Sequence, residues 1–201
     1  MLQRKTEADS RIDGRRVRGA DNRRRIVDAL LKLVAAGTVS PGAEQVATEA
    51  GVGLRTVFRH FSDMESLYRE ISERMTAEIQ PIVEQPFESK DWQDRLVELV
   101  DRRALVFERL LPFKVAGDAH RHDSTFLTTE QSALVKTQRK SLRNAVSPKV
   151  ADDKIRFEAL DLLLSFESWR RLRRDQGLSI RDARAAMLLG VEALTARSTG
   201  R

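Results

Sequence analysis

The stretch EQVATEAGVGLRTVFRHF, residues 44–61, decides the fold. Two short segments with apolar residues at helical spacing flank the turn at residues 51–53, which begins and ends with glycine. Val57, Phe58 and Phe61 are expected to form the buried side of the second segment. Glycine at the start of the turn permits the left-handed backbone with which many helices end. The pattern therefore predicts two short helices joined by a tight turn, which is a helix-turn-helix.

The second helix of such a motif lies in the major groove of DNA. The residues outside its apolar face are of types that contact base edges or phosphates, namely Leu54, Arg55, Thr56, Arg59 and His60. Arg55 is the candidate for a guanine contact and Thr56 for a methyl or phosphate contact. His60 is the candidate for a phosphate contact, and Arg59 for either role. The alternative for each residue is a solvated surface side chain.

The rest of the chain also has helical patterns. A first helix is expected from an N-cap at Asp21 to Gly37, and a fourth from a capping box of Ser62 and Glu65 to the prolines at 81 and 86. A fifth helix is expected to start at the segment ESKDWQ and to kink or stop at Pro112, and a sixth to contain Phe126 and Leu142 and to end at Ser147-Pro148. Two final helices are expected over residues 151–175 and from Ser179 to about residue 196. With 33% charged and only 5% aromatic residues, the composition favours an all-α fold.

Composition also excludes several classes of protein. The chain has no cysteine, so disulfides and thiolate metal sites are absent. It has no run of about 18 apolar residues, and its first 16 residues lack the apolar centre of a secretory signal. A cytoplasmic protein without a membrane partner is therefore expected.

The positive charge is concentrated at the front of the chain. Residues 1–61 carry 12 Lys/Arg against 7 Asp/Glu, whereas residues 62–201 carry 24 against 23. We interpret residues 1–20 as a basic flexible arm that binds a polyanion, with a solubilising tail as the alternative. The arginines placed to follow the DNA backbone or enter the minor groove include Arg16, Arg18, Arg23, Arg24 and Arg25.

The front of the chain resembles the tetracycline-repressor family of bacterial regulators. The resemblance covers RRIVDALLKLVAAG as the first helix, AEQVATEAGVGLRTVFRHF as the helix-turn-helix and SDMESLYREI as the start of the fourth helix. It implies an Ω-shaped all-α homodimer that binds a palindromic operator, with an effector pocket in each C-terminal domain and a four-helix bundle at the dimer interface. The expected domains are thus residues 21–67 for DNA binding and 68–201 for effector binding and dimerisation.

Three positions depart from the family pattern. Gly42 stands where the family often has a phosphate-contacting threonine, Phe58 where it favours tyrosine, and Met64 where it usually has lysine. Gly42 is kept as a candidate DNA-contact position. Because lost phosphate contacts weaken binding at cellular salt, we expect the basic arm to compensate.

The segment 151–175 is apolar on two sides, so one side is expected to meet a partner copy. The candidate dimer-interface residues are Phe157, Leu160, Leu164, Met187, Val191 and Leu194. The candidate walls of a pocket for an apolar or aromatic effector, with plain core packing as the alternative, are Met75, Ile79, Phe107, Leu110, Phe113, Phe126, Phe166 and Trp169.

Other functions have weaker support. His120, His122, Asp118 and Asp123 could hold a metal, but a solvated polar loop is the simpler reading of this stretch, so neither a metal nor a cofactor is expected. The arginines at 170–174 suit a helix C-terminus, although a second nucleic-acid patch is the alternative. There is no phosphate-binding loop or nucleophile elbow, so an enzyme is not expected. The main alternative to a regulator is a nonspecific architectural DNA-binding protein.

Overall fold

A computed structural model describes residues 3–118 and 124–196, with side chains from residue 17 onward. In this part of the chain every regular element is a helix, so the predicted all-α class is confirmed. The elements are α1 (Gln3–Ala35), α2 (Ala43–Ala50), α3 (Leu54–His60), α4 (Met64–Glu84), α5 (Trp92–Asp118), α6 (Thr125–Ala145), α7 (Pro148–Asp152), α8 (Lys154–Leu163), α9 (Phe166–Arg170), the π-helical turn η2 (Arg171–Asp175) and α10 (Ile180–Thr195).

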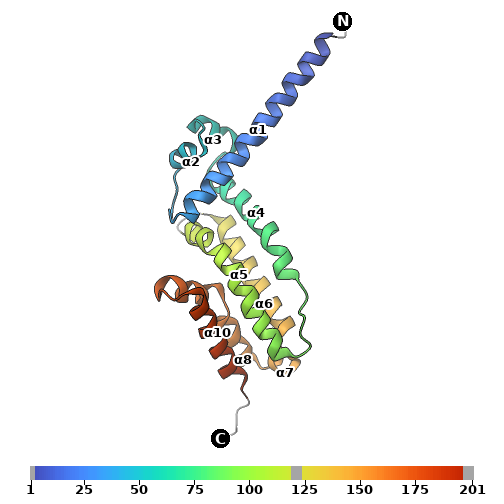
Figure 1. The fold of residues 1–201 in the computed structure, drawn as a ribbon, viewed down its shortest axis with the longest axis vertical. Coiled ribbons are helices and arrows are strands. Elements are labelled where there is room, and N and C mark those ends of the chain that lie inside the picture. Colours follow the sequence, from blue (N-terminus) through green and yellow to red (C-terminus); the bar gives the residue numbers. More distant parts are fainter. Residues whose placement is uncertain (1–2, 119–123, 197–201) are drawn as a thin grey trace. The chain divides into compact units, whose positions relative to one another are not determined.

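The chain divides into two compact units, of which the first comprises Met1–Met75 and Pro112–Phe126. The boundary expected after residue 67 therefore falls inside α4. In this unit α1 packs against α2 and α3 (Figure 1). The apolar faces of the three helices are almost fully buried, with Ile26, Leu30, Val46, Val57 and Phe61 at the centre. This three-helix head is the one that the sequence predicts.

Helix α1 begins at Gln3, so the prediction of an N-cap at Asp21 is wrong, and the segment interpreted as an arm is helical from Gln3 onward. The chain has no proline before Pro41, and its first 20 residues include five arginines, which favour helix. An isolated segment of this kind would be marginal as a helix, but here it extends a helix already held by the head. Figure 1 shows α1 continuing past α2 and α3.

Helix α4 is capped one residue later than expected, by Asp63 and not by Ser62. The carboxylate of Asp63 accepts the backbone N–H of Ser66 at 2.7 Å, and the hydroxyl of Ser66 accepts the N–H of Asp63 at 3.4 Å. The Ser66 N–H is the main reason that the pKa of Asp63 lies below its usual value. Glu65 does not act as the reciprocal partner.

Two prolines lie inside helices. Helix α4 contains Pro81 and ends at Glu84, between the two prolines that were expected to bracket its end. Helix α5 continues through Pro112, where a kink or an end was expected, to Asp118. A proline removes one backbone hydrogen bond and costs helix stability. Around Pro112 the buried side chains of Leu111 and Ala116 offset this cost.

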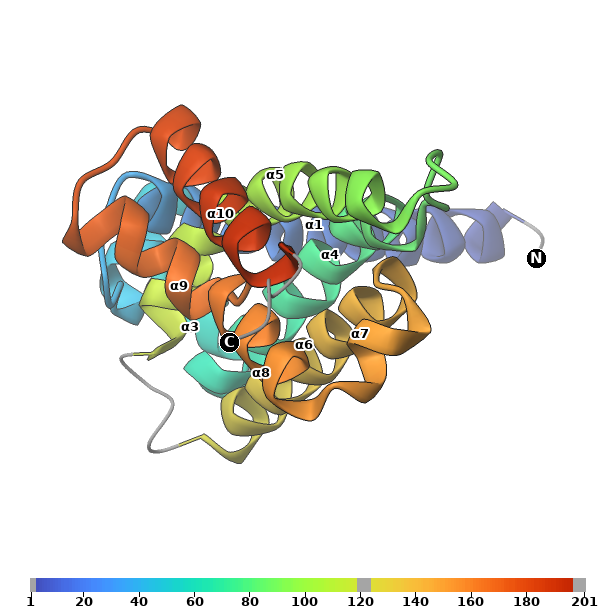
Figure 2. The same cartoon turned by 90° about the horizontal axis from the view of Figure 1, so that it is seen from below.

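The second unit comprises Thr76–Leu111 and Leu127–Arg201. Helix α10 packs against α8 (Figure 2). The most deeply buried side chains of this unit include Leu96, Leu142, Leu160, Trp169 and Met187.

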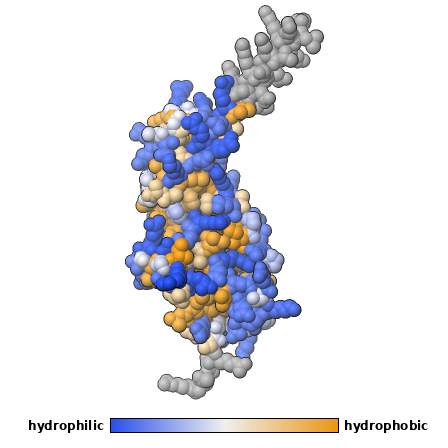
Figure 3. Space-filling view, in the orientation of Figure 1, coloured by the Kyte–Doolittle hydropathy of each residue, from blue (hydrophilic) through white to orange (hydrophobic). Residues whose placement is uncertain are grey.

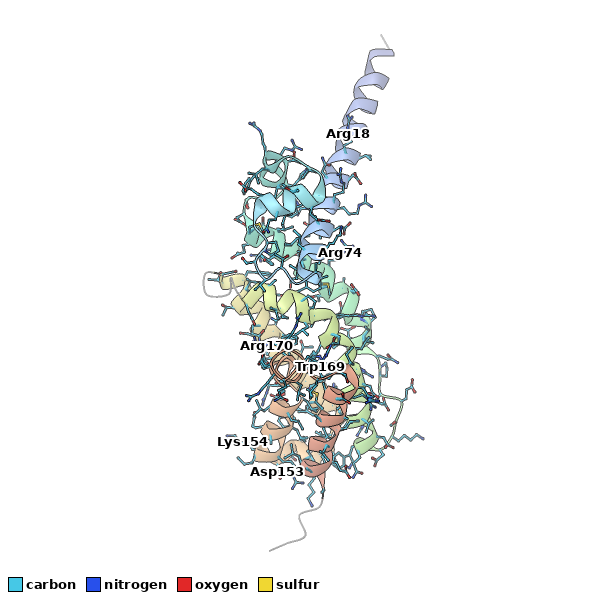
Figure 4. The ribbon with its side chains drawn as sticks, turned by 60° about the vertical axis from the view of Figure 1, so that its left-hand side comes forward. Arg18, Arg74, Asp153, Lys154, Trp169 and Arg170 are labelled. Atoms are coloured by element: carbon cyan, nitrogen blue, oxygen red, sulfur yellow. The ribbon has the colours of Figure 1, made fainter. Side chains whose placement is uncertain are left out.

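The single helix expected over residues 151–175 is instead four short pieces. The side chain of Asp153 caps α8 by accepting the N–H of Arg156 at 3.1 Å, and Ser165 caps α9 by accepting the N–H of Ser168 at 3.1 Å. Figure 4 labels Asp153 beside Lys154 at the start of α8, and Trp169 inside the unit. Polar capping side chains compete with helix continuation, and they interrupt the helix here.

Candidate nucleic-acid interface

The turn between α2 and α3 has the backbone geometry that the sequence predicts. Gly51 has φ 62° and ψ 40°, the left-handed conformation. Its N–H donates to the carbonyl of Thr48 at 3.1 Å, and the N–H of Val52 donates to the carbonyl of Ala47 at 3.0 Å. This pair of bonds closes α2 as a Schellman motif. With Gly53 as the N-cap of α3, the turn fixes the direction of α3.

Arg25 attaches this turn to α1. Its Nη2 atom donates to the carbonyl oxygens of Ala50 at 2.6 Å and Gly51 at 3.2 Å. The sequence interpretation placed Arg25 among the arginines that follow the DNA backbone, and the structure corrects this. The cause is its position on α1, where it reaches the carbonyls left free at the end of α2.

Arg23 is also turned toward the head. It donates to the carbonyl of His60 at 2.9 Å, forms an ion pair with Glu70, and stacks 4.5 Å from the centre of the Phe61 ring. Its charge is therefore shared with a carboxylate of the same chain. This corrects its assignment as an outward phosphate-binding cation.

The exposed face of α3 carries two cations and two apolar side chains. Arg55 and Arg59 are exposed, and within the described ranges neither is assigned a hydrogen bond or an ion pair. Leu54 is 37% exposed and Phe58 is 50% exposed. Arg55 and Arg59 are four residues apart, and so are Leu54 and Phe58. Residues four apart lie on the same side of a helix, so the members of each pair lie side by side on α3. Thr56, on the same helix, is half-buried.

Phe58 was expected in the core, and that prediction is wrong. Val57 and Phe61, four residues apart, take the buried positions at 2% exposure each. Phe58 is one residue beyond Val57 and is rotated by about 100° around the helix axis. The outward edge of α3 is therefore less polar than the sequence interpretation implied.

His60 is less suited to a phosphate contact than expected. Burial, followed by the charges of Arg59 and Arg23, holds the pKa of His60 below its usual value, so its ring is mostly neutral at pH 7. Its Nε2 atom is buried and has no hydrogen-bond partner in the described residues.

The remaining candidate DNA-contact residues lie on α1 and at the start of α2. Arg24 is exposed and lies 3.6 Å from Asp21. Arg18 is exposed on α1 (Figure 4), whereas the side chain of Arg16 lies outside the described residues. Gly42 is the N-cap of α2, and its N–H already donates to the Gln45 side chain at 2.9 Å.

The candidate pocket residues divide between the two units. Met75, Phe113 and Phe126 belong to the first unit, where Arg69 stacks 4.1 Å from the ring centre of Phe126. The second unit holds the others, which are Ile79, Leu110, Phe107, Phe166 and Trp169. Among these, the rings of Phe107 and Phe166 meet edge to face, with centres 5.5 Å apart.

The apolar sides of α8 and α10 are reversed relative to the sequence interpretation. Five candidate dimer-interface residues are buried within the chain, namely Phe157, Leu160, Leu164, Met187 and Val191, while Leu194 is half-buried. The exposed apolar residues are Ile155 at 79%, Leu162 at 70% and Leu189 at 68%. The pattern of apolar positions alone cannot assign a side, because a helix that is apolar on two sides can turn either face inward.

Other kinds of site find no support in the described residues. They contain no group of three His, Cys, Asp or Glu side chains that could hold a metal, although His120, His122 and Asp123 lie outside them. No helix in the part of the chain that was searched is long and apolar enough to cross a membrane.

These observations define a class of protein: an all-α chain with an N-terminal helix-turn-helix head and a further helical unit. No family model and no curated protein matches the sequence. A solved structure does match, that of a candidate TetR-family transcriptional regulator from Mesorhizobium loti MAFF303099. The match has a TM-score of 0.58 and 17% sequence identity, and it covers 89% of this chain and 97% of that chain. The resemblance seen in the sequence is thus confirmed for the fold.

Proposed function

We propose that this protein is a DNA-binding transcriptional regulator of the TetR type, acting in the cytoplasm as a homodimer. The observation that carries the proposal is the outward pair Arg55 and Arg59 on a helix fixed by the turn at Gly51. Arginine binds guanine edges and phosphates in the major groove. The likeness in fold to a candidate TetR-family regulator supports the same conclusion.

Dimerisation is proposed through α8 and α10. Three large aliphatic side chains there are more than two-thirds exposed, namely Ile155, Leu162 and Leu189. Figure 3 shows an apolar area on the lower part of the molecule, where these helices lie. A homodimer would place two recognition helices on successive major grooves of one face of the duplex, about 34–36 Å apart.

We further propose that the protein is a repressor and that a small molecule bound in the second unit releases it from DNA. Such a ligand must bind the released state more tightly than the DNA-bound state. The apolar interior of the second unit supplies the hydrophobic part of such a site, with the Phe107 and Phe166 pair at its centre.

Selection from a random DNA pool with the purified full chain tests the proposal. A regulator should enrich an inverted repeat whose half-sites are about one helical turn apart, and footprinting should show protection of both. A nonspecific architectural protein would enrich no sequence and would protect the duplex evenly. That outcome would replace the present proposal by the alternative.

A further inference from the structure

The second unit contains a buried cation that no carboxylate neutralises directly. Arg103, on α5, is 4% exposed. Its Nη1 donates to the carbonyl of Leu164 at 2.6 Å, and its Nη2 donates to the carbonyl of Gln138 and the hydroxyl of Ser141 at 2.6 and 3.1 Å. All three acceptors are neutral. Within residues 3–118 and 124–196, Arg103 is assigned no ion pair.

The electrostatic surroundings leave this charge poorly compensated. Burial lowers the pKa of Arg103 to about 10, and the charge of Asp161 acts in the opposite direction. Arg139, however, already holds the carboxylate of Asp161 at 2.7 Å. The guanidinium is still protonated at pH 7, so a full positive charge remains in the interior.

Two buried hydrogen-bond donors on these residues have no acceptor. They are Nε of Arg103 and Nε2 of Gln138, both buried and without a partner in the described residues. The orientation of the Gln138 amide is fixed, because its Oε1 accepts the N–H of Phe166 at 3.2 Å. Both side chains converge on the break between α8 and α9, where one binds Leu164 and the other binds Phe166. Buried donors left without acceptors cost free energy.

The same place has an aromatic wall. Phe107 follows Arg103 by four residues on α5, and its ring meets that of Phe166 edge to face at 5.5 Å. Phe166 is also the residue whose N–H orients Gln138. The polar and aromatic groups therefore belong to one cluster, which we define as Arg103, Gln138, Phe107 and Phe166.

We infer that this cluster is the recognition end of the effector site and that it takes an apolar molecule bearing a carboxylate. The oxygens would accept from Arg103 Nε and Gln138 Nε2 and neutralise the buried charge, while the apolar body would lie against the two phenylalanine rings. The inference rests on the proposed function for the existence of an effector. It adds an anionic group to the apolar ligand expected from the sequence.

The probe set is a panel of straight-chain carboxylic acids of four to twelve carbons and phenyl-substituted acids, each paired with its primary amide. Phenyl phosphate distinguishes a carboxylate from a phosphate. The full chain carries Trp92→Phe, so that Trp169, fully buried three residues from Phe166, is the remaining tryptophan. Binding is measured by its fluorescence and by calorimetry at fixed ionic strength, without DNA.

The decisive variant is Gln138→Glu. It keeps an oxygen for the N–H of Phe166 and replaces the free donor with a carboxylate beside Arg103. It should raise the melting temperature and weaken binding of the acids at least tenfold. Gln93→Glu, at an exposed position on α5, makes the same change in net charge and should leave binding unaltered. Arg103→Gln is the second variant. It removes the buried charge, but it also removes the hydrogen bonds to Leu164 and Gln138 that hold the break between α8 and α9.

The expected result is saturable binding of at least one acid, at least tenfold tighter than its amide and than phenyl phosphate. The inference is overturned if no acid binds, if amides bind as well as acids, or if Gln138→Glu binds acids normally. Preference for phenyl phosphate would assign the site to phosphate esters and would likewise overturn the carboxylate assignment. Each of these failures leaves the DNA selection unaffected, so it is distinguishable from a failure of the proposed function.

Discussion

Arg25 on α1 donates a 2.6 Å hydrogen bond to the carbonyl of Ala50, the last residue of α2. The bond joins the first helix to the turn that directs α3. A charged donor satisfies a carbonyl that the end of α2 leaves without an intrahelical partner. The orientation of α3 therefore depends on a side chain that lies 29 positions before Leu54, the first residue of that helix.

Arg25→Ala should destabilise the head by about 1 kcal/mol, since a partly buried hydrogen bond from a charged group is lost. Thermal unfolding followed by circular dichroism measures the change. Arg24→Ala is the matched control, because Arg24 is exposed and pairs weakly with Asp21 at 3.6 Å. Equal effects of the two substitutions would contradict the role given to Arg25.

Gly51→Ala should lower the stability of the head by more than the loss of a left-handed glycine alone explains. A Cβ at this position would lie 2.8 Å from Nη2 of Arg25, whereas a Cβ at Gly37, which also has positive φ, would meet nothing within 4 Å. Each substitution carries a backbone strain of about 1 kcal/mol. The excess cost of Gly51→Ala over Gly37→Ala should shrink in an Arg25→Ala background, as a double-mutant cycle would show. An excess that is unchanged in that background would refute the steric explanation.

Arg55→Ala should weaken binding to the selected operator by about 5- to 150-fold and relax the preference at one base pair. Arg59→Ala should instead lower affinity evenly across sequences and reduce the salt slope by about 1 if it contacts phosphate. Arg181→Ala, at an exposed site on α10, is the control. Fluorescence anisotropy against salt concentration measures all three. Full affinity in the Arg55 variant would remove it from the proposed site.

Removal of residues 1–19 should weaken DNA binding and lower its salt dependence, because this segment of α1 carries basic residues. The measurement is the slope of log affinity against log salt for the shortened and full chains. An unchanged slope would show that this part of α1 does not neutralise phosphates. Circular dichroism of the shortened protein checks that the three-helix head remains folded.

Leu162→Glu should convert the proposed homodimer to a folded monomer, because Leu162 is 70% exposed in the single chain. Val39→Glu, at an exposed apolar position in the first unit, should leave the dimer intact. Leu160→Glu should unfold the second unit, since Leu160 is fully buried. Sedimentation combined with circular dichroism separates these outcomes. A dimer that survives Leu162→Glu and Leu189→Glu would place the interface elsewhere.

The sequence predicts the head well because its determinants are local. The positive φ of Gly51 and the spacing of Val57 and Phe61 require no knowledge of the rest of the chain. The side of α8 that faces inward depends on distant neighbours, so Phe157 and Leu162 could not be assigned from spacing alone. The breaks in the segment 151–175 had a local signal, the capping residues Asp153 and Ser165, which the apolar pattern obscured.

Arg103 shows a different limit of sequence reasoning. Its segment, LVDRRALVF, is consistent with a surface arginine next to Arg102, and nothing local indicates which of the two is buried. The difference arises because the carbonyls of Leu164 and Gln138 are brought to α5 by the fold. The buried charge of Arg103, on which the proposed effector site depends, therefore cannot be found from the sequence.

The uncompensated charge at Arg103 has a consequence for the amount of protein in the cell. An anion that neutralised it would bind the folded chain and not the unfolded one, and at about one hundred times its dissociation constant it would add about 2.7 kcal/mol to stability. Proteolysis acts on opened chains, so occupancy would lengthen the half-life of the protein. The same small molecule would then control both the amount of this protein and its release from DNA. When the level of the molecule falls again, more protein would be present to bind DNA.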